Sequence, residues 1–322
     1  MTSEIHYSLL HIHTTLYSMI ITPQFQATKL SQKIGLKTPL YIKREDLHPL
    51  GSHKGRSIPL MIEKYIENGI KSFVISSSGN AGLASILTIQ NYNQRHTEDK
   101  INLKIFVGNK IPRHKLKNLI DAIKTKEITI EQINNPKQIA FQTEKNSADK
   151  NGDVNIKFLR QSTDDYALEG YFELAEELST IKDLNAVFIP TSSGTCAEGI
   201  YEGFKKLGIK PEIHIIQTDS CHTIAKNFYE NNIIPPSSPS LALAIVDNVG
   251  HRTKNVIKAI KNTNGMGWIA NNNEIREAVK IIKQTTNLEI SPNSALSLVG
   301  LAKALKLNWE FKGPIVLLFT GN

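Results

Sequence analysis

The 322-residue sequence has only two cysteines, Cys196 and Cys221, and it has no long apolar run. Two cysteines make neither a disulfide framework nor a zinc site, so we expect no metal site and a reducing, cytoplasmic compartment. No apolar stretch approaches the roughly 20 residues of a membrane-spanning helix, and we expect no membrane partner. Glu4, His6 and His11 interrupt the start of the chain, which argues against a signal peptide there.

The basic residues are more numerous than the acidic ones, but they are not gathered into one run. Thirty-eight basic and 30 acidic residues give a net charge of +8. The densest basic cluster, residues 110–117, is typical of a solvated helix start. Because the sequence has no interleaving of basic and aromatic residues on a strand and no triphosphate motif, a nucleic-acid partner is not expected. A positive field of this size favours anionic small molecules instead.

Strand and helix patterns alternate along the chain, which predicts an α/β fold of open, mostly parallel twisted sheets with helices on both faces. Residues 134–162 are polar and irregular, and we interpret them as long loops or a hinge between two lobes. We expect residues 40–155 to form the smaller lobe, and residues 1–39 and 156–322 the larger. Strands are predicted at 41–46, 71–76, 103–107, 127–130, 185–190, 212–217 and 314–319. Helices are predicted at 27–34, 58–66, 83–89, 114–123, 167–178, from 197, and at 222–229, 273–285 and 294–306.

Lys54 lies where the strand at 41–46 gives way, through a loop, to the helix that contains residues 58–66. In the first turn of a helix, the dipole and the unpaired N–H groups oppose a positive charge and lower the pKa of a lysine. A neutral amine is what reaction with an aldehyde requires. The alternative is an ordinary lysine pointing into water at a helix start, and this stretch alone does not decide between the two.

Three segments follow predicted strands and are rich in hydroxyl groups. Residues 76–82 hold three serines and an asparagine at a helix start, where N–H groups and hydroxyls can bind a carboxylate. Residues 191–195 have small side chains that suit a single phosphate, but they lack the lysine of a P-loop. Thr320 ends the last strand. Helix capping explains the two loops equally well, but ligands of such sheets bind at the carboxyl ends of the strands, in the cleft between lobes.

In this order, the segments resemble the fold type II pyridoxal-phosphate enzymes, the tryptophan-synthase-β family, and are closest in pattern to threonine synthase and threonine dehydratase. The resemblance covers most of the chain and implies pyridoxal 5'-phosphate as cofactor, a small amino-acid substrate and a homodimer. It rests on Thr22-Pro23, the lysine motif at 41–56, the asparagine loop at 77–80, the phosphate loop at 191–195 and the terminal motif at 318–322.

The resemblance also implies a role for each motif residue. Lys54 would bond to the cofactor aldehyde and then take the substrate α-proton. Asn80 would bind the cofactor's phenolic oxygen, and Thr320 would face its ring nitrogen. The remaining assignments are Ser77, Ser78 and the amide of Ala81 for the substrate carboxylate, and Ser192, Ser193, Gly194 and Thr195 for the cofactor phosphate.

A neutral hydroxyl at Thr320 cannot keep the ring nitrogen protonated, which makes the ring a weaker electron sink. This suits elimination or replacement at the β (or γ) carbon, where the leaving group carries the charge away, and it suits transamination poorly. The resemblance therefore implies a lyase or synthase of amino-acid metabolism. The alternative is a protein of the same fold that binds the cofactor or an amino acid without turnover.

Two features depart from the family pattern. Glu198 lies close to the phosphate loop, and we expect it to turn outward along its helix or to pair with a basic residue. Ala167 occupies the position of a threonine-synthase arginine that grips the substrate phosphate, and its presence argues against O-phosphohomoserine as the substrate. The nearby Asp164 and Asp165 could instead receive a cationic or hydroxylated substrate end.

Overall fold

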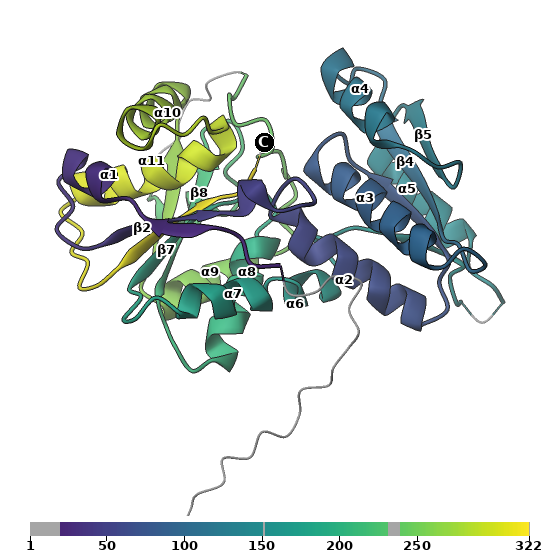
Figure 1. Cartoon of the computed structure of the whole chain (residues 1–322), viewed down its shortest axis with the longest axis horizontal. Coiled ribbons are helices and arrows are strands. Elements are labelled where there is room, and N and C mark those ends of the chain that lie inside the picture. Colours follow the sequence, from purple (N-terminus) through teal and green to yellow (C-terminus); the bar gives the residue numbers. More distant parts are fainter. Residues whose placement is uncertain (1–19, 151, 231–238, 322) are drawn as a thin grey trace, which may run out of the picture.

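The structure is a computed structural model that describes residues 20–150, 152–230 and 239–321. Two sheets stand side by side, each with helices on its faces (Figure 1). Among the described strands every pairing is parallel except that of β1 with β2. The predicted α/β class with two mostly parallel sheets is confirmed. In these ranges no helix combines the length and the apolarity that crossing a membrane requires.

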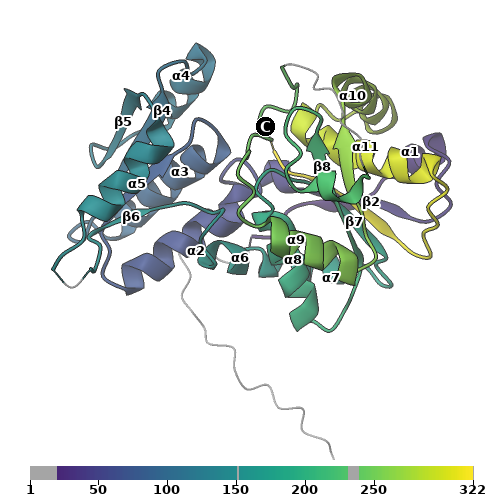
Figure 2. The same cartoon turned by 180° about the vertical axis from the view of Figure 1, so that it is seen from behind.

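The larger sheet has six strands and is covered on both faces. Its central strands β10 and β7 are buried throughout, as their uninterrupted apolar runs predict. Helices α1, α10 and α11 pack on one face, and α7, α8 and α9 pack on the other (Figure 2). The strand order is β1 (Gln24–Gln26), β2 (Leu40–Arg44), β10 (Ile315–Phe319), β7 (Ala186–Pro190), β8 (Glu212–Thr218) and β9 (Gly267–Ala270). The helices are α1 (Thr28–Lys33), α10 (Asn272–Thr286), α11 (Pro292–Lys306), α7 (Phe172–Ser179), α8 (Thr195–Lys206) and α9 (Thr253–Asn262).

The smaller sheet has four strands and its own apolar core. Helices α2, α3 and α4 contribute to the core on one face, and α5 packs on the other. The strand order is β5 (Ile128–Ile133), β4 (Asn102–Gly108), β3 (Ser72–Ser76) and β6 (Ile156–Phe158). The helices are α2 (Lys54–Glu67), α3 (Asn80–Arg95), α4 (Arg113–Ala122) and α5 (Pro136–Asn146).

A short helix, α6 (Tyr166–Glu169), packs against both α2 and α8. The backbones approach so closely here that a Cβ atom at Gly170 would lie 2.2 Å from the carbonyl oxygen of Arg56. A Cβ atom at Gly199, on α8, would lie 2.7 Å from the carbonyl oxygen of Leu168. Three helices from different parts of the chain are therefore in direct backbone contact.

The predicted division into lobes stays a prediction. At each of its two boundaries, one strand pairs with a strand of the other predicted lobe. Strand β2, at residues 40–44, pairs with β10 in the six-stranded sheet. Strand β6, at residues 156–158, pairs with β3 in the four-stranded sheet. Residues 1–19 of the predicted larger lobe lie outside the described residues.

Some element predictions were wrong. Residues 134–162 are not loops throughout, because they contain α5, which starts at Pro136, and β6. A proline suits the first turn of a helix, since its missing N–H would have no helical partner there. The helix predicted at 167–178 is interrupted at Gly170, and only a 3₁₀ turn at Ala225–Phe228 lies in the stretch 222–229. Helix α9 and strand β9 were missed.

Candidate active site

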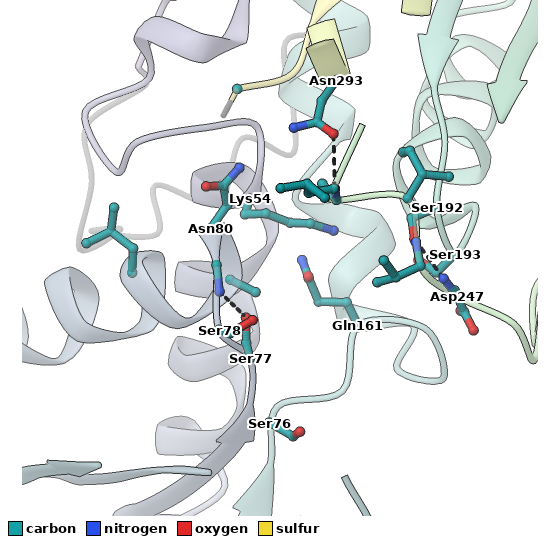
Figure 3. Close-up of a pocket in the computed structure, with 18 of the residues that line it drawn as sticks. Lys54, Ser76, Ser77, Ser78, Asn80, Gln161, Ser192, Ser193, Asp247 and Asn293 are labelled. Atoms are coloured by element: carbon teal, nitrogen blue, oxygen red, sulfur yellow. Dashed lines mark hydrogen bonds between the residues drawn. The ribbon is translucent and has the colours of Figure 1, made fainter. Parts of the chain in front are cut away.

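A cavity of about 890 Å³ lies between the two sheets, at the carboxyl ends of their strands. Figure 3 shows Lys54 extending into it, with the loop of Ser77 and Ser78 on one side and that of Ser192 and Ser193 on the other. Every predicted site residue lines this cavity: Lys54, Ser77, Ser78, Asn80, Ala81, Ser192, Ser193, Gly194, Thr195 and Thr320. The strand-end argument therefore placed these residues together correctly.

Lys54 is the first residue of α2, as the sequence pattern predicted. Burial lowers the pKa of its amine below the ordinary lysine value, and it outweighs the opposing charges of Cys196 and Asp247. The neighbouring Cys196 also lines the cavity, and burial raises the pKa of its thiol. Both groups are therefore biased toward their uncharged forms, and the Lys54 amine is the more nucleophilic of the two in that form.

His53 joins the lysine loop to the end of strand β10. Its backbone N–H and its Nδ1 both contact the carbonyl oxygen of Thr320, at 3.1 and 2.7 Å. Because a carbonyl only accepts, Nδ1 carries the hydrogen. Burial and then the charge of Lys54 lower the pKa of His53 to about 3, so the ring is neutral near pH 7. The histidine fixes Thr320 relative to Lys54 without adding a charge to the cavity.

The asparagine loop is both a helix cap and a wall of the cavity. The hydroxyl oxygen of Ser77 accepts hydrogen bonds from the backbone N–H groups of Gly79 and Gly82, at 3.3 and 3.1 Å. A hydroxyl that accepts in this way still has its own hydrogen to donate. Helix α3 begins at Asn80, whose side chain is drawn close to Lys54 in Figure 3. The capping and ligand-binding interpretations of this loop are therefore compatible.

The loop at 191–195 makes a tight turn into α8. Gly194 has φ +93°, and a Cβ atom there would lie 2.7 Å from Cγ2 of Val256, so a side chain is excluded on two grounds. Ser192 Oγ accepts from the backbone N–H groups of Val246 and Asp247, at 3.1 and 3.2 Å. This contact ties the loop to residues 243–247, which also border the cavity.

The side chains that follow in this loop contact one another and a neighbouring backbone. The hydroxyl groups of Ser193 and Thr195 lie 2.9 Å apart. Thr195 Oγ1 donates to the carbonyl oxygen of Gln161, at 3.2 Å. The loop therefore presents hydroxyl groups and the start of a helix, which together favour an anion.

Glu198 pairs with a basic residue, one of the two outcomes we expected. Its carboxylate accepts from Arg252 Nη1 at 3.0 Å and from Asn255 Nδ2 at 2.8 Å, and its side chain is 7% exposed. The hypothesis that Asp164 and Asp165 receive the substrate is wrong, because neither lines the cavity. Asp164 accepts from the hydroxyl of Tyr65 at 2.6 Å, and Asp165 contacts Arg252 at 3.2 Å.

Ala167 is fully buried in the apolar core rather than facing the cavity. Its presence at that position therefore says little about a substrate phosphate. The cavity wall formed by the smaller sheet instead carries the basic side chains of His114, Lys115, Lys137 and Arg160, of which the first two belong to the cluster at 110–117.

Gln161 and Asn293 also line the cavity and were missed. The Gln161 side chain donates to Ser57 Oγ on α2, and Asn293 Oδ1 accepts from the backbone N–H of Ala244 at 3.0 Å. Gln161 closely follows β6, so the rule that ligands gather at strand ends would have found it had that strand been predicted. Asn293 lies on α11 and carries no local signal.

The donor groups fit a cofactor that has an aldehyde, an aromatic ring and a phosphate. An amine of lowered pKa faces the cavity, and a turn that excludes side chains opens α8 beside three hydroxyl groups. Asp247 is the one acidic residue among those that line the described cavity, against Lys54, Lys115, Lys137 and Arg160. An anionic ligand is therefore favoured by charge.

Fold and cavity together define an α/β protein of two mostly parallel sheets, with a lysine between two hydroxyl-rich loops. The chain belongs to the pyridoxal-phosphate dependent enzyme family, whose sequence pattern matches residues 16–321. The predicted family and its cofactor, pyridoxal 5'-phosphate, are confirmed.

Several characterised proteins are similar to this chain. The threonine synthase of Methanocaldococcus jannaschii is 25% identical over 303 residues, which cover 88% of this chain and 70% of that protein. The mouse L-serine dehydratase/L-threonine deaminase is 26% identical over 237 residues, which cover 72% of this chain and 68% of that protein. Among solved structures, processed threonine deaminase isoform 2 of Solanum lycopersicum has a TM-score of 0.75 at 20% identity, covering 94% and 79%. A pyridoxal 5'-phosphate-dependent aspartate racemase has a TM-score of 0.74 at 18% identity, covering 94% and 90%. Different reactions are represented among them.

Proposed function

We propose that this chain is a pyridoxal-phosphate dependent lyase or synthase acting on a small L-amino acid. In this proposal it removes the α-proton and then eliminates or replaces a group at the β (or γ) carbon. The observation that carries the proposal is the Lys54 amine, which has a lowered pKa and faces the cavity between two hydroxyl-rich loops. Relatives named threonine synthase and serine dehydratase support the same type of reaction.

The cofactor would be held by residues from both sheets. The Ser192–Thr195 loop and the start of α8 would hold the phosphate, because N–H groups at a helix start and nearby hydroxyls favour an anion. Asn80 would donate to the phenolic oxygen, and the Lys54 amine would bond to the aldehyde. When bound, the cofactor supplies a conjugated ring that accepts the electron pair left at the α-carbon.

Substrate binding would fall to the asparagine loop. Ser77 and Ser78 would donate hydroxyl hydrogens to the α-carboxylate, together with the backbone N–H of Ala81 at the start of α3. Lys54 Nζ would then take the α-proton, because the lowered pKa of its amine favours the neutral form that a base requires.

Thr320 favours elimination or replacement over transamination. Its side chain is neutral, and its carbonyl is held by two hydrogen bonds from His53. A neutral partner does not keep the ring nitrogen protonated. The electron pair left by the α-proton is therefore better accepted by a departing group than held on the ring. We further propose that the protein is a cytoplasmic homodimer. Light scattering would test the dimeric state.

A panel of L-amino acids and their O-substituted forms tests the proposal. We expect release of ammonia and a keto acid, or of a leaving group such as inorganic phosphate, from at least one member. Chiral analysis of the recovered substrate would reveal racemisation, which would contradict a lyase. Cofactor absorbance that responds to amino acids without any product would favour the alternative, a non-catalytic binding protein.

A further inference from the structure

Arg252 lies behind the Ser192–Thr195 loop and is 5% exposed. It contacts four groups from two segments: Glu198 and Asp165 through Nη1, at 3.0 and 3.2 Å, and the carbonyl oxygens of Gln161 and Asp164 through Nη2, at 3.2 and 2.7 Å. Nε also points to the Gln161 carbonyl, at 3.4 Å. One guanidinium therefore ties α8 and the chain after β6 to the start of α9.

The position of Glu198 gives this arrangement its significance. Glu198 lies in the first turn of α8, the helix whose N-terminus would receive the cofactor phosphate. A carboxylate there repels a phosphate, and the repulsion is strong because the side chain is almost removed from water. Arg252 supplies the compensating positive charge at 3.0 Å, and Asn255 satisfies the other carboxylate oxygen.

Arg252 has a second effect, which acts through the backbone carbonyl of Gln161. Its carbonyl oxygen accepts from Thr195 Oγ1 as well as from Arg252. Since a carbonyl oxygen has two lone pairs, bonds from the guanidinium leave it satisfied when the Thr195 hydroxyl turns toward a ligand. Arg252 thus allows Thr195 to donate to a phosphate without leaving a buried acceptor unpaired.

We propose that Arg252 is a positioning residue of the phosphate site, which neutralises Glu198 and holds the Gln161 backbone so that the loop can accept a dianion. This inference rests on the proposed function in one respect, namely that the Ser192–Thr195 loop holds the cofactor phosphate. Arg252 itself does not line the cavity and is not expected to touch the cofactor.

A double-mutant cycle with Arg252→Gln and Glu198→Gln tests the proposal. The measurements are the dissociation constants of pyridoxal phosphate and of pyridoxal, which lacks the phosphate, by absorbance titration of the cofactor-free protein. Arg252→Gln should weaken pyridoxal phosphate binding about tenfold or more, while pyridoxal changes less than about twofold. When Glu198→Gln is added to the Arg252→Gln variant, it should recover at least about half of the loss, measured as the change in the logarithm of the pyridoxal phosphate dissociation constant. A matched control, Lys254→Gln, removes an exposed charge two residues away and should change neither constant by more than about twofold.

Several results would overturn the proposal. One is equal weakening of pyridoxal phosphate and pyridoxal by Arg252→Gln, and another is a double variant no better than the single one. Should Arg252→Gln not fold, Glu198→Gln alone decides, because it should tighten pyridoxal phosphate binding by about twofold or more and leave pyridoxal unchanged. Weaker or unchanged phosphate binding in that variant rejects the idea.

The same titrations separate this inference from the proposed function. If the wild-type protein binds pyridoxal as tightly as pyridoxal phosphate, the phosphate assignment of the loop fails. If it prefers pyridoxal phosphate and the Arg252 variants keep that preference in full, only the role of Arg252 fails.

Discussion

Arg56 lies two residues after Lys54, and its guanidinium is buried among carboxylates. It donates to both oxygens of Glu45, at 3.0 and 2.9 Å, and it contacts Glu177 at 2.6 Å. The side chains of Arg56 and Glu45 are 1% and 0% exposed. Lys43 also pairs with Glu177. Replacing Arg56 by methionine therefore leaves Glu177 with a cation but leaves Glu45 without one.

An ionised carboxylate that loses its buried partner costs about 3–5 kcal/mol of unfolding free energy. We expect Arg56→Met to lose an amount in this range at pH 7, measured by urea unfolding of the cofactor-free protein. The matched control is Lys104→Met, which breaks a pair with Glu131 whose side chains are 45% and 42% exposed. That variant should lose at most about 1 kcal/mol.

The loss of unfolding free energy in Arg56→Met should depend on pH. Burial raises the pKa of Glu45, but the hydrogen bonds and charge of Arg56 outweigh burial and hold the pKa below its ordinary value. A carboxyl whose pKa is lowered by folding contributes stability above its unfolded pKa and loses it as the pH falls through the folded pKa. Without Arg56, burial alone favours the protonated acid. The loss should therefore be largest near neutral pH and shrink as the pH falls, first through the pKa of Glu45 in the variant, which burial raises, and then through its lowered pKa in the wild type.

Glu45→Gln in the Arg56→Met background should recover much of the loss, because it removes the orphaned charge. A loss below about 1 kcal/mol at pH 7, or one that does not change with pH, would refute the view that this pair is a desolvated ion pair.

Three further predictions concern the cavity. Lys54→Ala should abolish turnover and the absorbance of the amine-bound cofactor while the far-ultraviolet circular dichroism is retained; persistent turnover would remove Lys54 from the chemistry. Thr195→Ala should weaken cofactor binding by about 1.5–3 kcal/mol, the value of a hydrogen bond to a charged group, and unchanged affinity in a titration would exclude this hydroxyl from the site. Gly194→Ala should weaken pyridoxal phosphate far more than pyridoxal, because the turn has positive φ and no room for a Cβ atom; equal affinities would place the phosphate elsewhere.

The sequence was sufficient to predict the features that depend on local chemistry. Uninterrupted apolar runs such as Ile315–Phe319 are typical of buried parallel strands, and loops after such strands meet at one edge. That reasoning placed Lys54, Ser77, Ser192 and Thr320 in one cavity. The position of Lys54 at the start of α2 also follows from local pattern.

Other features depend on contacts between distant residues and could not be read from local pattern. Arg252 and Glu198 are 54 positions apart, and nothing near either residue identifies its partner. Helix α5 was missed because its polar residues outnumber its one buried residue, Ala140. Strand β6 was missed because it has only three residues, of which Phe158 alone is buried. The hypothesis about Asp164 failed for a related reason, since Tyr65, which binds its carboxylate, is 99 positions away.

The backbone contacts at Gly170 and Gly199 have a mechanical consequence. Helix α2 begins with Lys54, and α8 begins at the Ser192–Thr195 loop. Helix α6 lies against both helices with almost no side chain between. The Lys54 amine and the Ser192–Thr195 loop are thus linked through backbone contacts, which cannot repack as side chains can, so a change at the start of one helix is passed directly to the other.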